Sequence, residues 1–124
     1  MIGRVAFAAV LFVASAPRAD DAALGRALFQ PCSACHAQVA GKPGMAGPDL
    51  AGLKGRRVGG AAGYDYSPAM KQGLASGAVW DLARLVRFLA DPDEMFPGLW
   101  MSAQPIRGEA DRQALAAYLL QQAP

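Results

Sequence analysis

The chain contains a single histidine and only two cysteines among its 124 residues. A zinc site needs about four protein ligands, or three with a water molecule, so Cys and His alone cannot build one here. Lysine is also scarce, with three residues in all. No segment alternates polar and apolar residues as a half-buried strand does. These shortages exclude a Cys/His zinc site and argue against a β-sheet protein.

The two cysteines and the histidine lie together, in Cys32-Ser33-Ala34-Cys35-His36. This spacing is typical of the attachment site of a c-type haem. Two thiols on one turn of chain can add to vinyl groups on the same side of a porphyrin, and the next residue then places an imidazole under the iron. We therefore predict one covalently attached haem c, bound through Cys32 and Cys35, with His36 as an axial ligand of its iron.

Two other interpretations of the motif stay open. A thioredoxin-like redox pair needs a strand before the cysteines and a helix after them, whereas residues 37–48 are rich in glycine and proline. A plain structural disulfide between Cys32 and Cys35 would give His36 no role. Haem attachment explains all three residues, so we prefer it.

The N-terminus has the features of a secretory signal peptide. One early positive charge precedes an apolar run, Val5–Ala14, that is too short to span a bilayer. We place the signal peptide at residues 1–19, with cuts after residue 15 or 16 as alternatives, and one domain at residues 20–124. An uncleaved membrane anchor is the competing interpretation. Export to the periplasm fits the cysteines, because haem is attached to thiols outside the cytoplasm.

The charge balance restricts the partners of the mature chain. Removing Arg4 and Arg18 leaves 10 basic side chains against 10 acidic ones. A nearly neutral protein is poorly suited to nucleic acid or to an anionic membrane surface. We therefore expect no nucleic-acid partner and no membrane partner after signal cleavage.

The spacing of apolar residues predicts a small all-α domain. We expect about three main helices with loops wrapped around the haem. A first helix is expected at about residues 21–30, a second ends before Pro92, and a third follows Gly108. Residues 37–78 read as loop, with a short helix near residues 69–74.

Several stretches beyond the haem motif resemble class I cytochromes c, most closely the mitochondrial and related bacterial branch. Gly47–Arg56 is similar to the family's GPNL-x-GL-x-GR stretch, and Gly63–Ser67 to its GYxYT segment. Asp91-Pro92, Pro97-Gly98 and Met101 match the spacing of its methionine loop, and Ala117–Leu119 matches its C-terminal helix. The resemblance covers about residues 22–120 and implies the cytochrome c fold.

A six-coordinate haem needs a second axial ligand, and the chain has no second histidine. Methionine is the natural candidate, and the residues alone leave Met70, Met95 and Met101 open, each with core filling as the competing interpretation. Met101 stands out because it follows the helix stop at Pro92 on an irregular loop. The resemblance implies that Met101 is the distal ligand.

The resemblance also implies supporting roles. The carbonyl of Pro48 would accept a hydrogen bond from the far nitrogen of His36, which fixes the ring and strengthens it as a donor. Arg56, Tyr66 and Trp80 match residues that hydrogen-bond the haem propionates, and a partly buried carboxylate needs such donors. The competing interpretations are a solvated arginine and ordinary core aromatics.

Three positions depart from the family's pattern. Leu99 stands where a threonine is usual, Trp100 where a lysine is frequent, and Phe88 where a tyrosine hydroxyl often donates toward the methionine sulfur. These changes remove polar groups around the ligand. They put in doubt the family's usual potential and its lysine-rich docking face.

We conclude from the sequence that the chain is a soluble, exported, monomeric one-haem electron carrier and not an enzyme. Its partners would be a redox protein donor and a redox protein acceptor. Phe96 and Trp100 are expected to be exposed aromatics near the haem edge, and they favour one alternative, a dedicated haem subunit of a periplasmic oxidoreductase complex. A second alternative is a haem enzyme or gas sensor with an open distal site, for which the chain lacks a distal histidine.

Overall fold

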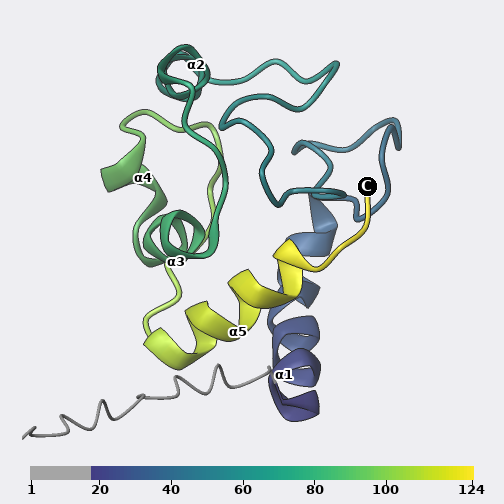
Figure 1. The fold of residues 1–124 in the computed structure, drawn as a ribbon. Coiled ribbons are helices and arrows are strands. Elements are labelled where there is room, and N and C mark those ends of the chain that lie inside the picture. Colours follow the sequence, from purple (N-terminus) through teal and green to yellow (C-terminus); the bar gives the residue numbers. More distant parts are fainter. Residues whose placement is uncertain (1–17) are drawn as a thin grey trace, which may run out of the picture.

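The computed structural model describes residues 18–124, which form helices joined by long loops (Figure 1). The proposed signal peptide therefore lies outside the described residues, apart from Arg18 and Ala19. Within residues 18–124 the only β-type pairing is one isolated antiparallel bridge, between Arg57 and Val79. In the same part of the chain, no helix combines the length and the apolarity needed to cross a membrane. The all-α prediction is confirmed.

Each of the four expected helices is present, and two short elements were not expected. The elements in chain order are α1 (Ala19–Phe29), the 3₁₀-helix η1 (Gln30–Ala34), α2 (Pro68–Ser76), α3 (Leu82–Ala90), α4 (Pro92–Met95) and α5 (Glu109–Leu120). The additional ones are η1 and α4. Pro92 was expected only to end a helix, but it also begins α4, where the Asp91 carboxylate caps the N–H of Glu94 at 3.0 Å.

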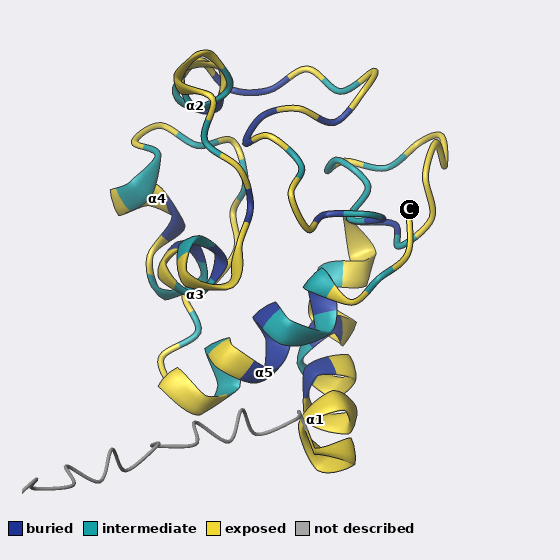
Figure 2. Cartoon of the chain, in the orientation of Figure 1, coloured by how far each residue is buried: buried dark blue, intermediate teal, exposed yellow. Residues whose placement is uncertain are grey.

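The helical core forms where α5 crosses α1 and packs against α3 (Figure 1). Gly25 permits the close crossing, because a Cβ there would lie 2.5 Å from the carbonyl oxygen of Ala114 and 2.5 Å from the Cβ of Tyr118. The inner faces of α3 and α5 hold most of the buried helical residues, as Figure 2 shows. The haem motif begins within η1, which follows α1 directly, so this crossing fixes the position of the motif.

An aromatic cluster joins α3 to the loops around it. The Trp80 ring meets the Phe88 ring edge-on, with centroids 5.2 Å apart, and Phe96 lies 6.5 Å from Trp80 and 6.0 Å from Phe88. Trp80 and Phe88 are buried, and Phe96 is half-buried. Phe96 therefore faces the core, which corrects the expectation that it forms an exposed aromatic surface with Trp100.

The chain after α5 returns to the loop that follows the haem motif (Figure 1). The N–H of Gly52 donates to the carbonyl oxygens of Gln122 and Ala123, at 3.3 and 3.2 Å. A second link comes from Gln38, whose Nε2 donates to the Tyr118 hydroxyl at 2.8 Å. Through these two links, α5 and the residues that follow it hold residues 37–56 in place, in addition to the packing of α5 against α1.

Candidate haem site

The CxxCH motif adopts a single tight turn. Backbone N–H groups of Cys35 and His36 both donate to the carbonyl oxygen of Cys32, at 3.1 and 2.9 Å. This turn places both thiols and the imidazole within one short segment, as haem attachment requires. Neither thiol is in a disulfide, and a helix, α1, precedes the motif where a thioredoxin-like pair would need a strand. The geometry thus favours haem attachment over both alternatives.

The two thiols differ in their surroundings. Cys35 is exposed, whereas Cys32 is half-buried and packs against the core. Burial raises the pKa of the Cys32 thiol, and the neighbouring Cys35 raises it further, while a backbone hydrogen bond opposes them. Cys32 is therefore protonated at neutral pH and less reactive than an ordinary surface thiol.

The His36 ring is held from one side by a loop. Its Nδ1 donates to the carbonyl oxygen of Pro48 at 2.8 Å, which leaves Nε2 as the nitrogen available to a metal. Gly47 lies directly against the ring, because a Cβ there would be 2.5 Å from Cε1 and 2.7 Å from Nδ1. The backbone contact expected between His36 and Pro48 is present, and only glycine leaves room for it.

Two backbone hydrogen bonds fix that loop beneath the motif. The N–H of Gly47 donates to Cys35 at 2.8 Å, and the N–H of Leu50 donates to Ala37 at 2.8 Å. Between them lies Pro48, whose carbonyl faces His36. The loop is thus attached to the residues that it supports.

Met101 lies on the loop between α4 and α5, half-buried and packed against the hydrophobic core. The N–H of Ile106 donates to Leu89 in the last turn of α3 at 2.9 Å, and the N–H of Gly98 donates to the Asp93 carboxylate at 3.1 Å. The loop is therefore anchored on both sides of Met101. Among the other candidates, Met70 is a fully packed core residue at 7% exposure and Met95 is half-buried.

Arg56 points inward and is bonded to its own loop. Its Nη1 donates to the Asp49 carbonyl at 2.6 Å, and its Nη2 donates to the Asp49 carboxylate at 3.0 Å and to the Ala51 carbonyl. The side chains of Arg56 and Asp49 are only 17% and 18% exposed. The solvated arginine considered from the sequence is therefore wrong. The sequence analysis assigned no role to Asp49, although the departure from the family's GPNL pattern marks that position.

Tyr66 is buried close to this ion pair. Its hydroxyl accepts the N–H of Ala61 at 3.1 Å, which leaves its own proton available for donation. Burial raises the pKa of Tyr66; Arg56 lowers it, and the Asp49 carboxylate raises it. Tyr66 therefore stays a neutral donor over the physiological pH range.

Trp80 is brought beside Arg56 by the backbone. The Trp80 N–H donates to the Arg56 carbonyl at 2.8 Å, and the Gly55 N–H donates to Trp80 at 3.0 Å. Its ring belongs to the aromatic cluster with Phe88 and Phe96. Arg56, Tyr66 and Trp80 thus come from one region of the fold, while Trp80 also serves the core.

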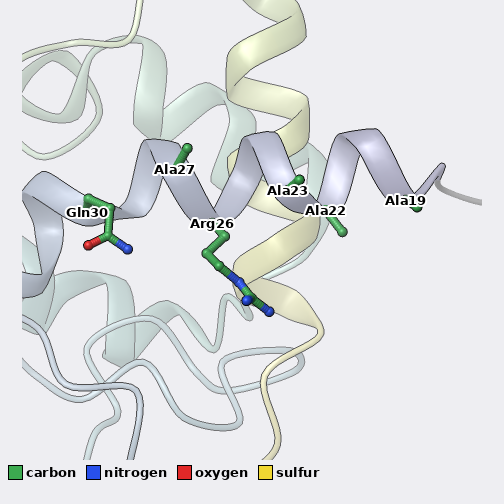
Figure 3. Close-up of a pocket in the computed structure, with 6 residues that line it drawn as sticks. All are labelled: Ala19, Ala22, Ala23, Arg26, Ala27 and Gln30. Atoms are coloured by element: carbon green, nitrogen blue, oxygen red, sulfur yellow. The ribbon is translucent and has the colours of Figure 1, made fainter.

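Two hollows lie on the surface of the described chain, and only one of them includes a predicted site residue, Trp80. One has a volume of about 430 Å³ and follows α1, lined by small side chains with Arg26 and Gln30 beside them (Figure 3). None of the residues predicted for the haem site lines it. The other, of about 420 Å³, lies between Lys54, Trp80 and α5.

Comparison with known proteins places the chain in a family. Residues 22–123 match the family model for cytochrome c. Cytochrome c2 of Agrobacterium tumefaciens is 41% identical over 100 residues, which cover 81% of this chain and 90% of that protein. Cytochrome c2 iso-1 of Magnetospirillum molischianum is 47% identical over 93 residues, covering 73% of this chain and 89% of that protein.

Solved structures agree with the sequence relatives. Cytochrome cH from Methylobacterium extorquens has a TM-score of 0.70 at 40% identity, covering 80% of this chain and 96% of that one. Ferricytochrome c2 from Rhodopseudomonas palustris has a TM-score of 0.69 at 35% identity with the same coverage. The chain belongs to the cytochrome c family. Within it, the chain is a one-haem, cytochrome c2-like electron carrier, not an enzyme.

The residues present fit the haem that this family implies. Two unpaired thiols and one imidazole share a turn, and the imidazole has its second nitrogen already bonded to Pro48. Apolar side chains from two loops, Leu50 on one and Leu99 and Met101 on the other, are half-buried and pack against the core. Such a set offers the covalent links, an axial donor and an apolar surface that a haem needs.

Proposed function

We propose that the chain transfers single electrons through a haem bound covalently to Cys32 and Cys35 and ligated by His36 and Met101. The observation that carries the ligand assignment is the 2.8 Å hydrogen bond from His36 Nδ1 to Pro48, which leaves the other ring nitrogen available to a metal. When bound, the haem supplies the one-electron couple of its iron. Met101 is supported by its anchored loop and by its place in the family's pattern.

The side chains of the site hold the iron's surroundings constant during transfer. His36 cannot rotate without breaking the bond to Pro48 or colliding with Gly47. The Met101 loop is tied to α3 and α4, so its thioether stays in place in both redox states. A thioether is a soft ligand, which favours the reduced iron and raises the potential relative to a second imidazole. Because the ligands of the iron rearrange little between the two redox states, electron transfer is fast.

The N-terminal sequence and the charge balance support a cellular location and a class of partners. The apolar N-terminal run supports export, with a signal peptide at residues 1–19, and therefore a periplasmic location. Its partners are a redox protein donor and a redox protein acceptor, and we expect the carrier to be a monomer. The near-neutral charge of the mature chain supports neither nucleic acid nor membrane as a partner.

Optical spectra of purified holoprotein test the ligand assignment. Met101→Ala should abolish the weak red methionine-to-iron band of the oxidised form and allow carbon monoxide to bind the reduced form. Met70→Ala and Met95→Ala serve as controls and should do neither, since Met70 is a buried core residue and Met95 lies in α4, outside the loop that carries Met101. Loss of the band in Met95→Ala, with the band retained in Met101→Ala, would overturn the assignment of the loop.

One feature favours a second candidate, a dedicated haem subunit of a periplasmic complex. Trp100 is 59% exposed on the Met101 loop, and exposed aromatic residues are enriched at lasting interfaces. Size-exclusion chromatography of the native protein from its source separates the two functions. A carrier elutes as a small single chain, whereas a subunit elutes with its complex.

A further inference from the structure

The ion pair of Arg56 with Asp49 is unlike the others of the described chain. Both of its side chains are less than one-fifth exposed, whereas Lys71 and Asp65 are 57% and 77% exposed. The third pair, Arg84 with Asp81, is also more open, at 32% and 60%. Charges that are shielded from water interact more strongly and are screened less by salt. The Arg56–Asp49 pair is therefore the one whose charges act most strongly on the groups around it.

The hydrogen bonds of Arg56 determine what else it can bind. A guanidinium offers its N–H donors in a fixed, planar fork. Each of its two bidentate edges, Nη1 with Nη2 and Nε with Nη2, includes Nη2. In this chain both hydrogens of Nη2 are taken, by the Asp49 carboxylate and by the Ala51 carbonyl. Neither edge remains free to hold a second carboxylate bidentately.

We propose that Asp49 is a positioning residue: it holds Arg56 in a closed ion pair, so that Arg56 does not clamp a haem carboxylate, and the iron is easier to oxidise than with asparagine at position 49. This inference rests on the proposed haem function. The carboxylate of Asp49 neutralises the guanidinium and leaves the haem carboxylates uncompensated on this side. Extra negative charge near an iron centre stabilises its oxidised, more positive state.

The position of Asp49 supports an effect on the iron rather than on a distant surface. It directly follows Pro48, the residue that accepts the hydrogen bond from His36 Nδ1. Its carboxylate also acts on a second group of the same region, since it raises the pKa of Tyr66. Tyr66 is left as a neutral donor that can still bond a haem carboxylate.

Asp49→Asn separates the charge of Asp49 from its geometry. The asparagine oxygen can still accept from Nη2, and the bond from Nη1 goes to the backbone carbonyl, which the substitution does not touch. The fold and the position of Arg56 should therefore survive, while one negative charge is lost. Asp65→Asn is the matched control, because Asp65 also pairs with a cation, Lys71 at 2.7 Å, but at the surface.

The experiment measures the midpoint potential of the holoproteins by optical redox titration. Asp49→Asn should raise the potential, Asp49→Glu should keep it near the wild-type value, and Asp65→Asn should change it little. The inference is overturned if the Asp49→Asn shift is no larger than that of Asp65→Asn, if it is downward, or if Asp49→Glu rises equally. A wild-type protein that binds no haem would instead refute the proposed function, and its spectrum would show this directly.

A second measurement needs no variant. In the reduced, diamagnetic holoprotein, nitrogen-15 NMR of the arginine side chains reports rotation and proton exchange at each guanidinium. We expect the Nη1 and Nη2 signals of Arg56 to be separate, with hydrogens that exchange slowly. One averaged Nη signal with rapid exchange would show an open guanidinium and overturn the inference.

Discussion

Replacing Gly47 with alanine tests how closely the loop packs beneath His36. A Cβ at this position would lie 2.5 Å from Cε1 of the ring and 2.7 Å from Nδ1, whereas favourable carbon contacts begin at about 3.5 Å. The ring or the loop must therefore move by about 1 Å. Either movement strains the 2.8 Å hydrogen bond between Nδ1 and Pro48, the next residue along the chain.

The expected cost follows from these two effects. Overpacking costs about 1–3 kcal/mol, and a hydrogen bond lost to misalignment costs about 1 kcal/mol. We expect Gly47→Ala to lower the free energy of unfolding by about 2–4 kcal/mol. Weakening the bond to Pro48 also makes His36 a poorer donor, so the oxidised iron loses stabilisation and the midpoint potential rises.

Guanidinium denaturation of the oxidised holoprotein, followed by absorbance, measures the free energy of unfolding. Redox titration measures the midpoint potential. Gly108→Ala is the control, because its backbone φ is −74° and the nearest atom to its Cβ would be 3.4 Å away. It should change the unfolding free energy by less than about 1 kcal/mol. A Gly47→Ala protein as stable as the control, with an unchanged potential, would refute the packing argument.

Three further predictions address the haem, its ligand exchange and its docking. Cys32→Ala with Cys35→Ala should give haem that acidic organic solvent extracts, or no holoprotein; extraction from the wild type would contradict covalent attachment. Any alkaline ligand exchange should use hydroxide or Lys71, since no lysine lies between Asp91 and Pro105; a second nitrogen ligand, opposite His36, that still forms at high pH in Lys71→Ala would refute this. The second-order rate with an electron acceptor should change less than tenfold between low and high ionic strength, and Trp100→Ala should slow it; a larger fall with salt would show that charge dominates docking.

The docking prediction rests on fewer exposed residues than were expected from the sequence. Phe96 packs against Trp80 and Phe88, and Leu99 is half-buried, so neither adds to an exposed apolar face. Arg56 is paired inside the protein and cannot steer a partner. Of Phe96, Leu99 and Trp100, only Trp100 is exposed, so the apolar contact is expected mainly from it. The three lysines and Arg57 supply the positive charge that can steer a partner.

The main helices could be predicted because their signals are local. Periodic apolar residues and Pro92 located α3, and the acids after Gly108 located the start of α5. The short helix α4 was missed because Pro92 was interpreted only as a residue that ends a helix. An aspartate followed by proline is also an N-cap and a first helical residue, which is how Asp91 and Pro92 act here.

The course of the loops could not be predicted from the sequence, because it depends on contacts between distant residues. Glycine content predicted that residues 37–78 are mostly loop, but it did not show that Leu50 bonds to Ala37 or that Gly52 bonds to the chain after α5. The partner of Arg56 was missed for the same reason. The family pattern implied that Arg56 bonds a haem propionate, whereas in the folded loop Arg56 is paired with Asp49.

These contacts make residues 47–56 act as one unit with two effects on the iron. Gly47 and Pro48 fix the axial imidazole, while Asp49 and Arg56 set the charge beside it. The two effects are linked through the backbone. The carbonyl of Pro48 accepts from His36, and the next carbonyl along the chain, that of Asp49, accepts from Arg56. A change of geometry at Gly47 should therefore also disturb the ion pair, whereas Asp49→Asn should leave the imidazole in place. Measured together, the potentials of the two single variants and of the double variant would reveal this coupling as a departure from additivity.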